Sequence, residues 1–215
     1  MFDRYTPEAL YEHIRRDVTH ITPSAPEIPA SALSLLAALA RYDVPTYRHS
    51  LRVAGLVWDM ALLVPLNRVE QERIWLAGLL HDCGKLWTPQ RILRHRGTLN
   101  AADAAIVRRQ SSDAATILAT LPGLNHIAGL LPNQSAYGER RYIIGVTIST
   151  MQTRVLVLAN DLDEMAHATP ALSTTQIRHI LQREAGRRWD ERLAKRLVWA
   201  WPFANSAALE IAVGA

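Results

Sequence analysis

The sequence predicts an all-α helical bundle, and three observations support this prediction. Apolar residues recur at helical spacing along most of the 215-residue chain, which is 49% hydrophobic and 20% charged. Residues that favour helix starts precede several of these segments, namely Thr6-Pro7, Asn67 and Asn100. The segment 142–149 (YIIGVTIS) has the β-branched composition of a strand, so we expect at most a short β segment there.

The expected helices follow one another with short breaks. Residues 6–20 form the first, with Thr6 as its N-cap, and the prolines at 23, 26 and 29 make 21–29 a linker. Further helices are expected over residues 31–41, 46–63, 68–82, 100–119, 122–131, 151–167, 174–185 and 190–200. Gly84 is expected to end the helix that precedes it. The chain is thus divided into an N-terminal helix and proline-rich linker (1–30), a helical domain (31–202) and a C-terminal tail (203–215).

Composition restricts location and partners. No run approaches about 20 uncharged apolar residues, so we expect no membrane-spanning helix, and the acidic residues near the start do not fit a secretory signal. Cys83 is the single cysteine, which excludes an intrachain disulfide and a cysteine cage for zinc, so we expect a cytoplasmic setting. The net charge of +4 is small, so nucleic acid is not the expected partner.

One short motif carries chemistry, His81-Asp82-Cys83-Gly84-Lys85, after the apolar run IWLAGLL. A neutral imidazole beside a carboxylate is a ligand pair for a divalent metal. His49 opens another helix, and antiparallel packing would bring it opposite His81. A lone histidine on an apolar helix is more often a core residue, but the two motifs together favour a metal site. A metal there would activate water and polarise a phosphoryl oxygen, with Lys85 close enough to neutralise a phosphate.

The chain resembles the HD superfamily of phosphohydrolases, and within it the HD-GYP branch. The resemblance covers about residues 45–201 and includes YRHSLRVAGLVWDMA, WLAGLLHDCGKLWTPQRIL, GTLNAADAAIVRRQSSDAATIL, RVLVLANDLDEMA and ILQREAGRRWDERLAKRL. It implies an HD-domain helical bundle whose metal centre cleaves phosphodiesters, cyclic di-GMP above all. By the same resemblance, His49, His81 and Asp82 match metal ligands, and Lys85 matches the lysine that contacts the scissile phosphate.

Several positions depart from the family pattern, so we expect a degenerate metal centre. Pro45 stands in place of a glutamate ligand, and Gln110 stands in place of a histidine. Gln134-Ser135 fall where a histidine pair is expected, and the GYP signature is reduced to Ala136-Tyr137-Gly138. Neutral oxygen donors are weaker ligands than imidazole or carboxylate. A site for several metal ions would therefore lack most of its ligands.

A single-metal site remains compatible with the sequence. Asn160 stands where the family has its final aspartate ligand, and Asp161 follows it. Either residue would be the fourth ligand, although a one-residue shift turns a helical side chain by about 100°, so a cap or salt bridge is the other role for Asp161. For Arg52, one turn after His49, phosphate binding and pairing with an acid inside the bundle are equally favoured.

Two functions from different classes follow. In the first, the chain is a metal-dependent phosphohydrolase of the phosphodiesterase type, related to cyclic di-GMP phosphodiesterases. Its divalent metal is Fe, Mn or Mg, Asp82 and Lys85 are catalytic, and Lys85 and Arg52 bind substrate. In the second, it is an inactive HD-GYP relative without metal that regulates by binding a nucleotide or a protein. A cyclic dinucleotide is the expected small-molecule partner, and a homodimer fits either function. The sequence leans to the enzyme.

Overall fold

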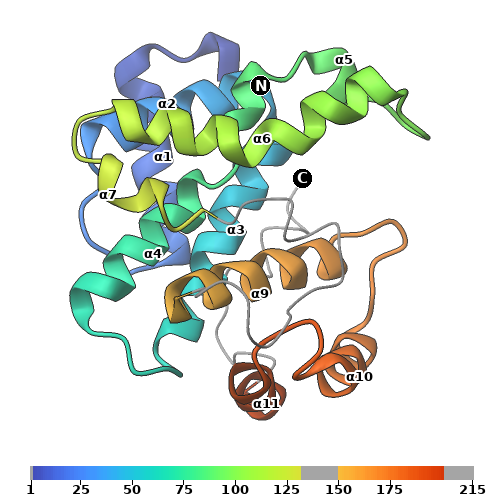
Figure 1. Ribbon diagram of the computed structural model, residues 1–215. Helices are drawn as coiled ribbons and strands as arrows, with labels where there is room; N and C mark the ends of the chain where they lie inside the picture. Colours follow the sequence, from blue (N-terminus) through green and yellow to red (C-terminus); the bar gives the residue numbers. More distant parts are fainter. Residues whose placement is uncertain (1, 132–149, 201–215) are drawn as a thin grey trace.

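Helices account for the regular structure in the computed structural model, which describes residues 2–131 and 150–200 (Figure 1). The α-helices are α1 (Pro7–Ile21), α2 (Ala30–Tyr42), α3 (Val44–Ala61), α4 (Arg68–Leu80), α5 (Gln90–Leu93), α6 (Ala101–Thr120), α7 (Asn125–Ala128), α9 (Met151–Ala166), α10 (Thr174–Glu184) and α11 (Glu191–Ala200). Two short 3-10 helices accompany them, η1 (Phe2–Arg4) and η2 (Cys83–Trp87). Because the described ranges contain no strand, the all-α class is confirmed. The β segment predicted at 142–149 and the tail predicted at 203–215 lie outside the described residues.

Side-chain caps fix the starts of three long helices. The Thr6 hydroxyl accepts a hydrogen bond from the backbone of Ala9 at the start of α1. Asn67 forms a capping box with the third residue of α4, and the Asn100 side chain caps α6 in the same position. These caps are the ones that the sequence predicted. The predicted helix over 122–131 is reduced to the single turn α7.

Helix α3 runs through the middle of the bundle and packs against α2, α4 and α9 (Figure 1). Its contact with α4 is close because both helices carry small residues there: a Cβ added at Gly78 would lie 3.2 Å from the Cα of Ala54. The two helices run antiparallel, so the same contact brings the start of α3 beside the end of α4. This crossing therefore sets His49 next to His81.

The N-terminal helix α1 shares the core of the bundle. Leu10, Ile14 and Val18 are buried along one of its faces, which packs on α2 and α3. The segment predicted as a separate N-terminal unit, residues 1–30, therefore contributes side chains to the same hydrophobic cluster as the helices that follow it.

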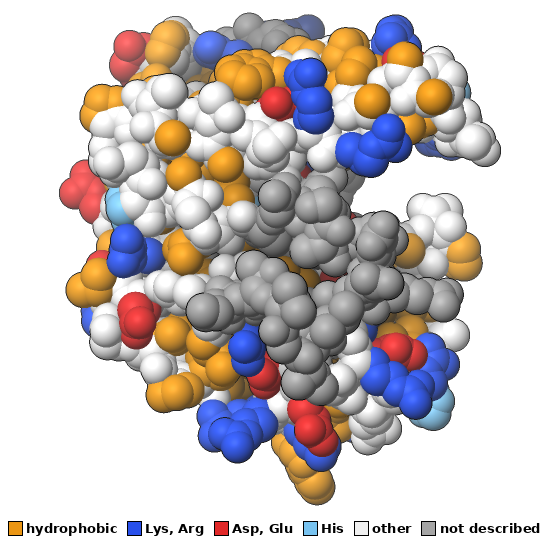
Figure 2. Space-filling view, in the orientation of Figure 1, with side chains coloured by type: hydrophobic (Ala, Val, Ile, Leu, Met, Phe, Trp, Pro, Cys, Tyr) orange, Lys and Arg blue, Asp and Glu red, His pale blue; other side chains and the backbone are white. Residues whose placement is uncertain are grey.

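Helices α10 and α11 lie beside α9 at the bottom of the view in Figure 1. An ion pair between Arg154 of α9 and Asp190 (2.8 Å) ties them together. Some basic side chains of this region pair with acidic ones, as in Arg183–Glu184 and Lys195–Glu191. Figure 2 shows basic and acidic side chains close together in the lower part of the molecule. These ion pairs offset part of the positive charge, although residues 174–200 carry seven Arg and Lys against three Asp and Glu. None of the described helices is both long and apolar enough to cross a membrane.

Candidate metal centre

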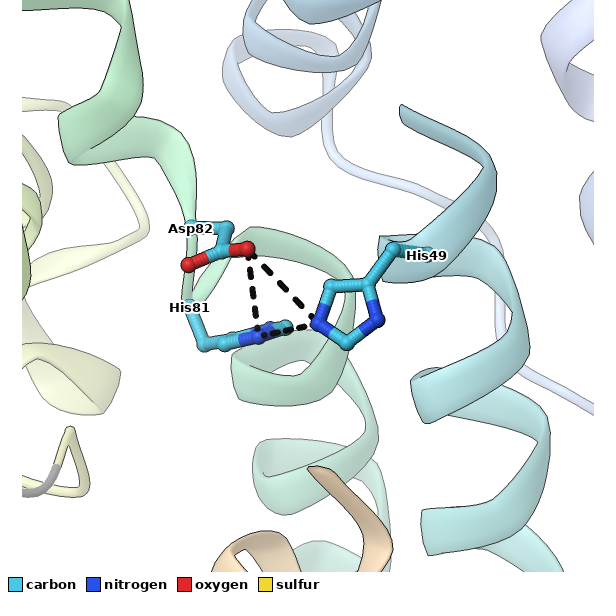
Figure 3. Close-up of side chains that lie close together, drawn as sticks. All are labelled: His49, His81 and Asp82. Carbon is cyan, nitrogen blue, oxygen red and sulfur yellow. Dashed lines mark hydrogen bonds and ion pairs between the residues drawn. The ribbon is translucent and has the colours of Figure 1, made fainter. Parts of the chain in front are cut away.

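Three side chains from two neighbouring helices converge on one point. His49 projects from the start of α3, while His81 and Asp82 lie where the chain leaves α4 and enters η2. The two imidazole Nε2 atoms are 3.2 Å apart, and Asp82 Oδ2 lies 3.6 Å from that of His49 and 3.7 Å from that of His81. Figure 3 shows the two rings and the carboxylate turned toward one another. All three are mostly buried, with side-chain exposures of 11–14%.

Hydrogen bonds behind the two rings fix which nitrogen carries the proton. His49 Nδ1 lies 2.7 Å from a carboxylate oxygen of Asp163, and His81 Nδ1 lies 2.9 Å from the backbone carbonyl of Gly78. Both partners only accept, so each Nδ1 donates its hydrogen. In the neutral rings, both Nε2 lone pairs therefore face the shared point. Such outer hydrogen bonds are typical of histidines that bind metals.

Helix α9 supplies a fourth acceptor atom. Asn160 Oδ1 lies 3.0 Å from His49 Nε2, and its Nδ2 donates to Glu164 at 2.9 Å. Four acceptor atoms thus lie within hydrogen-bonding distance or slightly beyond, and a proton or a cation between them satisfies the cluster. Neighbouring ligands of an octahedral ion with bonds of about 2.1 Å lie about 3 Å apart, which is close to the spacing seen here. His49, His81 and Asp82 form a group that can hold a metal ion.

Lys85 lies beside the cluster as a charged ammonium group. Its Nζ donates to Asp82 Oδ2 at 2.6 Å. Burial by itself lowers the pKa of Lys85, but the adjacent Asp82 carboxylate outweighs it, and the pKa lies above its ordinary value. Burial likewise raises the pKa of Asp82, while the charges of Lys85, His81 and His49 outweigh that effect and hold it well below its ordinary range. Burial lowers the pKa of His81, which favours the neutral ring that a metal needs.

Asp163 contacts the cluster through His49, and the sequence analysis did not single it out as a candidate. It accepts from His49 and from the Nε and Nη2 atoms of Arg52, at 2.7 and 2.9 Å. Burial by itself raises the pKa of Asp163, but hydrogen bonds from His167, His49 and Arg52 outweigh burial and hold it far below its ordinary range. The spacing could have indicated it, because Asp163 lies three residues after Asn160 and therefore near the same face of the helix.

The same contacts define the position of Arg52. The side chain is buried, and its guanidinium is committed to Asp163 through two hydrogen bonds. Of the two roles expected from the sequence, pairing with an acid inside the bundle is the one the geometry supports. Arg52 then acts on the cluster through Asp163 and His49.

Asp161 faces away from the cluster. Its Oδ2 accepts from the indole nitrogen of Trp189 at 2.7 Å and from Arg188 at 3.1 Å, and it is 3% exposed. The turn of about 100° between consecutive helical residues accounts for this direction. Asp161 therefore fastens the segment before α11 to α9, and Asn160 is the residue that reaches His49.

Of the remaining departures from the family pattern, Gln110 and Pro45 lie within the described residues and the others do not. Gln110 is buried on α6, and its amide donates to the hydroxyl of Thr88 at 3.0 Å, so it belongs to the packing of α6 on η2. Pro45 lies in the first turn of α3. Gln134-Ser135 and Ala136-Tyr137-Gly138 lie outside the described residues.

The fold and the cluster define a helical domain with a candidate divalent-metal centre. A family model for the HD domain matches residues 34–193, which is more than half of the chain, so the chain belongs to the HD-domain family. This confirms the superfamily that the sequence predicted. Assignment to the HD-GYP branch and the degeneracy of the centre stay predictions.

Three relatives with curated functions are similar to parts of the chain. The 3'3'-cGAMP-specific phosphodiesterase 1 of Vibrio cholerae is 29% identical over 146 residues, which cover 65% of this chain and 34% of the relative. A cyclic di-GMP phosphodiesterase of Pseudomonas aeruginosa is 35% identical over 108 residues, or 47% of this chain and 26% of the relative. A cyclic di-GMP phosphodiesterase of Thermotoga maritima is 33% identical over 87 residues, or 40% and 24%. The chain thus matches about a third of the length of the first relative and about a quarter of each of the other two.

Proposed function

We propose that the chain is a metal-dependent phosphodiesterase that acts on cyclic dinucleotides. The observation that carries this proposal is the convergence of two imidazole lone pairs and a carboxylate, from His49, His81 and Asp82, on one point. Membership of the HD-domain family and similarity to enzymes named for cyclic di-GMP and 3'3'-cGAMP support the substrate class.

We assign the metal to His49, His81, Asp82 and Asn160. Two nitrogen donors and two oxygen donors suit Fe or Mn better than Mg, because Mg prefers oxygen ligands. A bound divalent cation supplies Lewis-acid chemistry, since it lowers the pKa of a water and polarises a phosphoryl oxygen. Asp163 keeps the proton of His49 on Nδ1, so that Nε2 remains a ligand, and Arg52 holds Asp163 in place.

Lys85 is the proposed catalytic residue of the chain itself. Its ammonium is charged and rests on Asp82, next to the point where a phosphate would bind. A fixed positive charge there stabilises the negative charge that develops on the phosphate oxygens during hydrolysis.

The proposal is tested by metal content and turnover measured together. The protein is loaded with Mn²⁺ or Fe²⁺ and incubated with cyclic di-GMP, 3'3'-cGAMP or an aryl phosphodiester. We expect turnover that His81→Ala and Asp82→Ala both abolish, with loss of bound metal. His179→Ala, at an exposed position on α10, is the matched control and should change neither quantity. Turnover that persists in both ligand variants would exclude this mechanism.

A second function, an inactive relative that binds a nucleotide or a protein, is favoured by one contact. Gln110 stands at a position where the family resemblance implies a histidine ligand. Its amide donates a hydrogen bond to Thr88 instead. This leaves fewer ligands for a centre with several metals. Binding of cyclic di-GMP with neither bound metal nor hydrolysis would favour this function over the enzyme.

A further inference from the structure

Two side chains of α9, Asn160 and Glu164, extend the cluster of His49, His81 and Asp82. They lie one helical turn apart, and Asn160 Nδ2 donates to Glu164 Oε1 at 2.9 Å. Glu164 is exposed, whereas Asn160 is half-buried against His49. We propose that Glu164 is a positioning residue of the metal centre, which makes the neutral amide of Asn160 an effective oxygen ligand. The inference rests on the proposed function, because it takes the metal site as given.

The first step of the argument concerns the orientation of the amide. The Asn160 side chain has two faces, an oxygen that can bind a cation and an NH₂ that cannot. Turned over, its NH₂ would donate to the Nε2 lone pair of His49 and would block the ligand point with a good hydrogen bond. Glu164 prevents this, since a carboxylate accepts and therefore holds the NH₂ end. The oxygen is left facing His49 Nε2 at 3.0 Å.

The second step concerns charge. Asp82 brings one negative charge to the cluster, but Lys85 sits on it at 2.6 Å and cancels it. The two histidines and Asn160 are neutral ligands, so the nearby carboxylates of Asp43 and Glu164 add to the attraction for a divalent cation. With Glu164 the pair on α9 carries the same charge as a single aspartate. A hydrogen bond to a carboxylate also draws electron density onto the amide oxygen and raises its basicity.

Glu164 also acts on Lys85, whose ammonium contacts Asp82. Burial lowers the pKa of Lys85, and the neighbouring negative charges that outweigh it are those of Asp82, Asp43 and Glu164. Glu164 therefore lies close enough to act on the same ammonium that contacts Asp82. An exposed glutamate elsewhere on the bundle, such as Glu191 on α11, has its contact with Lys195 of its own helix.

A double-mutant cycle on the metal-free protein tests the inference through metal affinity. The variants are Glu164→Gln, Asn160→Asp and the double variant, and Mn²⁺ binding is followed by titration calorimetry and by the free-ion EPR signal. In the natural background we expect Glu164→Gln to weaken Mn²⁺ binding by about tenfold, as for other outer partners of metal ligands. In the Asn160→Asp background the loss should be clearly smaller, because an aspartate has no NH₂ for Glu164 to orient and only the charge of Glu164 is then removed. Glu191→Gln is the matched control and should leave the affinity unchanged.

The outcomes distinguish a failure of the role of Glu164 from a failure of the proposed metal site. Wild-type affinity in Glu164→Gln overturns the positioning role, and so does an equal loss in both backgrounds, which would indicate a structural effect on α9. If the wild-type protein binds no Mn²⁺, the proposed metal site itself fails, and the role of Glu164 fails with it. Far-UV circular dichroism of each variant checks that α9 is intact.

Discussion

Two regions of the bundle, called here the α3–α4 wall and the α6–η2 wall, hold their polar side chains in opposite ways. On the α3–α4 wall, His49 and His81 use Nδ1 for hydrogen bonds behind the ring and leave Nε2 aimed at the common point. On the α6–η2 wall, Gln110 and Thr88 satisfy each other. Gln110 and Thr88 are each other's hydrogen-bond partners, so they need nothing further to stay buried. The converging lone pairs of His49 and His81 have no donor between them and are satisfied by a proton or a cation. The difference predicts that mutations on the first wall remove metal and that mutations on the second remove only stability.

The largest effect is expected at Asp163, which supports the first wall from behind. Asp163→Ala leaves the buried guanidinium of Arg52 without its carboxylate, and removing one partner of a buried ion pair destabilises by about 3–5 kcal/mol. The variant also frees the Nδ1 proton of His49, so metal affinity should fall by about 10–100-fold. Urea unfolding and Mn²⁺ titration measure the two effects.

Asp161→Ala is the matched control for Asp163, since both carboxylates are buried on α9. It loses the hydrogen bonds from Trp189 and Arg188 and should also destabilise the protein. Its metal affinity should stay at the wild-type value. Loss of metal in both variants would mean that the whole helix moves, and the contrast between the two positions would disappear.

The next effect separates metal binding from catalysis. Lys85 and a metal ion share Asp82 Oδ2, so they compete for it. Lys85→Met should therefore bind Mn²⁺ more tightly than the wild type. Turnover of a phosphodiester should nevertheless fall by about 10²–10³-fold, because the charge that stabilises the phosphate is gone. A parallel decrease of affinity and turnover would contradict the competition.

A smaller effect is expected on the second wall. Gln110→Ala removes the donor to the buried Thr88 hydroxyl, and the loss of one such hydrogen bond costs about 1–3 kcal/mol. Mn²⁺ affinity should be unchanged, as measured by the same titration. Thr88→Val, which removes the other partner, should give a similar stability and the same affinity. Weaker metal binding in either variant would place Gln110 at the metal centre after all.

The sequence predicted the parts of the fold and the site that local chemistry controls. Thr6, Asn67 and Asn100 cap the helices that the sequence predicted them to start, because their side chains accept hydrogen bonds from the first turn. Packing of two antiparallel helices was enough to predict that His49 and His81 meet. These features depend on residues close in sequence or on one helix pair.

The sequence left open the features that depend on the orientation of a third helix. The rotation of α9 decides that Asn160 and Asp163 face the cluster while Asp161 faces Trp189, and the repeat of apolar residues does not fix that angle to better than one residue. Gly84 was expected to end a helix, yet α4 ends at Leu80. A Cβ at Gly84 would lie 1.9 Å from the backbone oxygen of Gln110, so the glycine permits η2 to touch α6.

The smallest effect is expected at Asp59 on α3, outside the site. It tests whether a buried carboxylate without compensating partners among the described residues destabilises the fold. Partners outweigh burial at Asp163, but at Asp59 burial raises the pKa from 3.8 to about 6. The unfolded chain therefore releases this proton at lower pH than the folded protein, and Asp59 lowers stability progressively as the pH rises from about 4 to about 6. Asp59→Asn should be more stable than the wild type at pH 7, by on the order of 1 kcal/mol after allowance for solvent screening. The gain should become small at about pH 3, below the ordinary pKa of 3.8, where both states of the wild type are mostly protonated. Urea unfolding at the two pH values measures the difference, and a gain of equal size at both would show that the charge of Asp59 is not its cause.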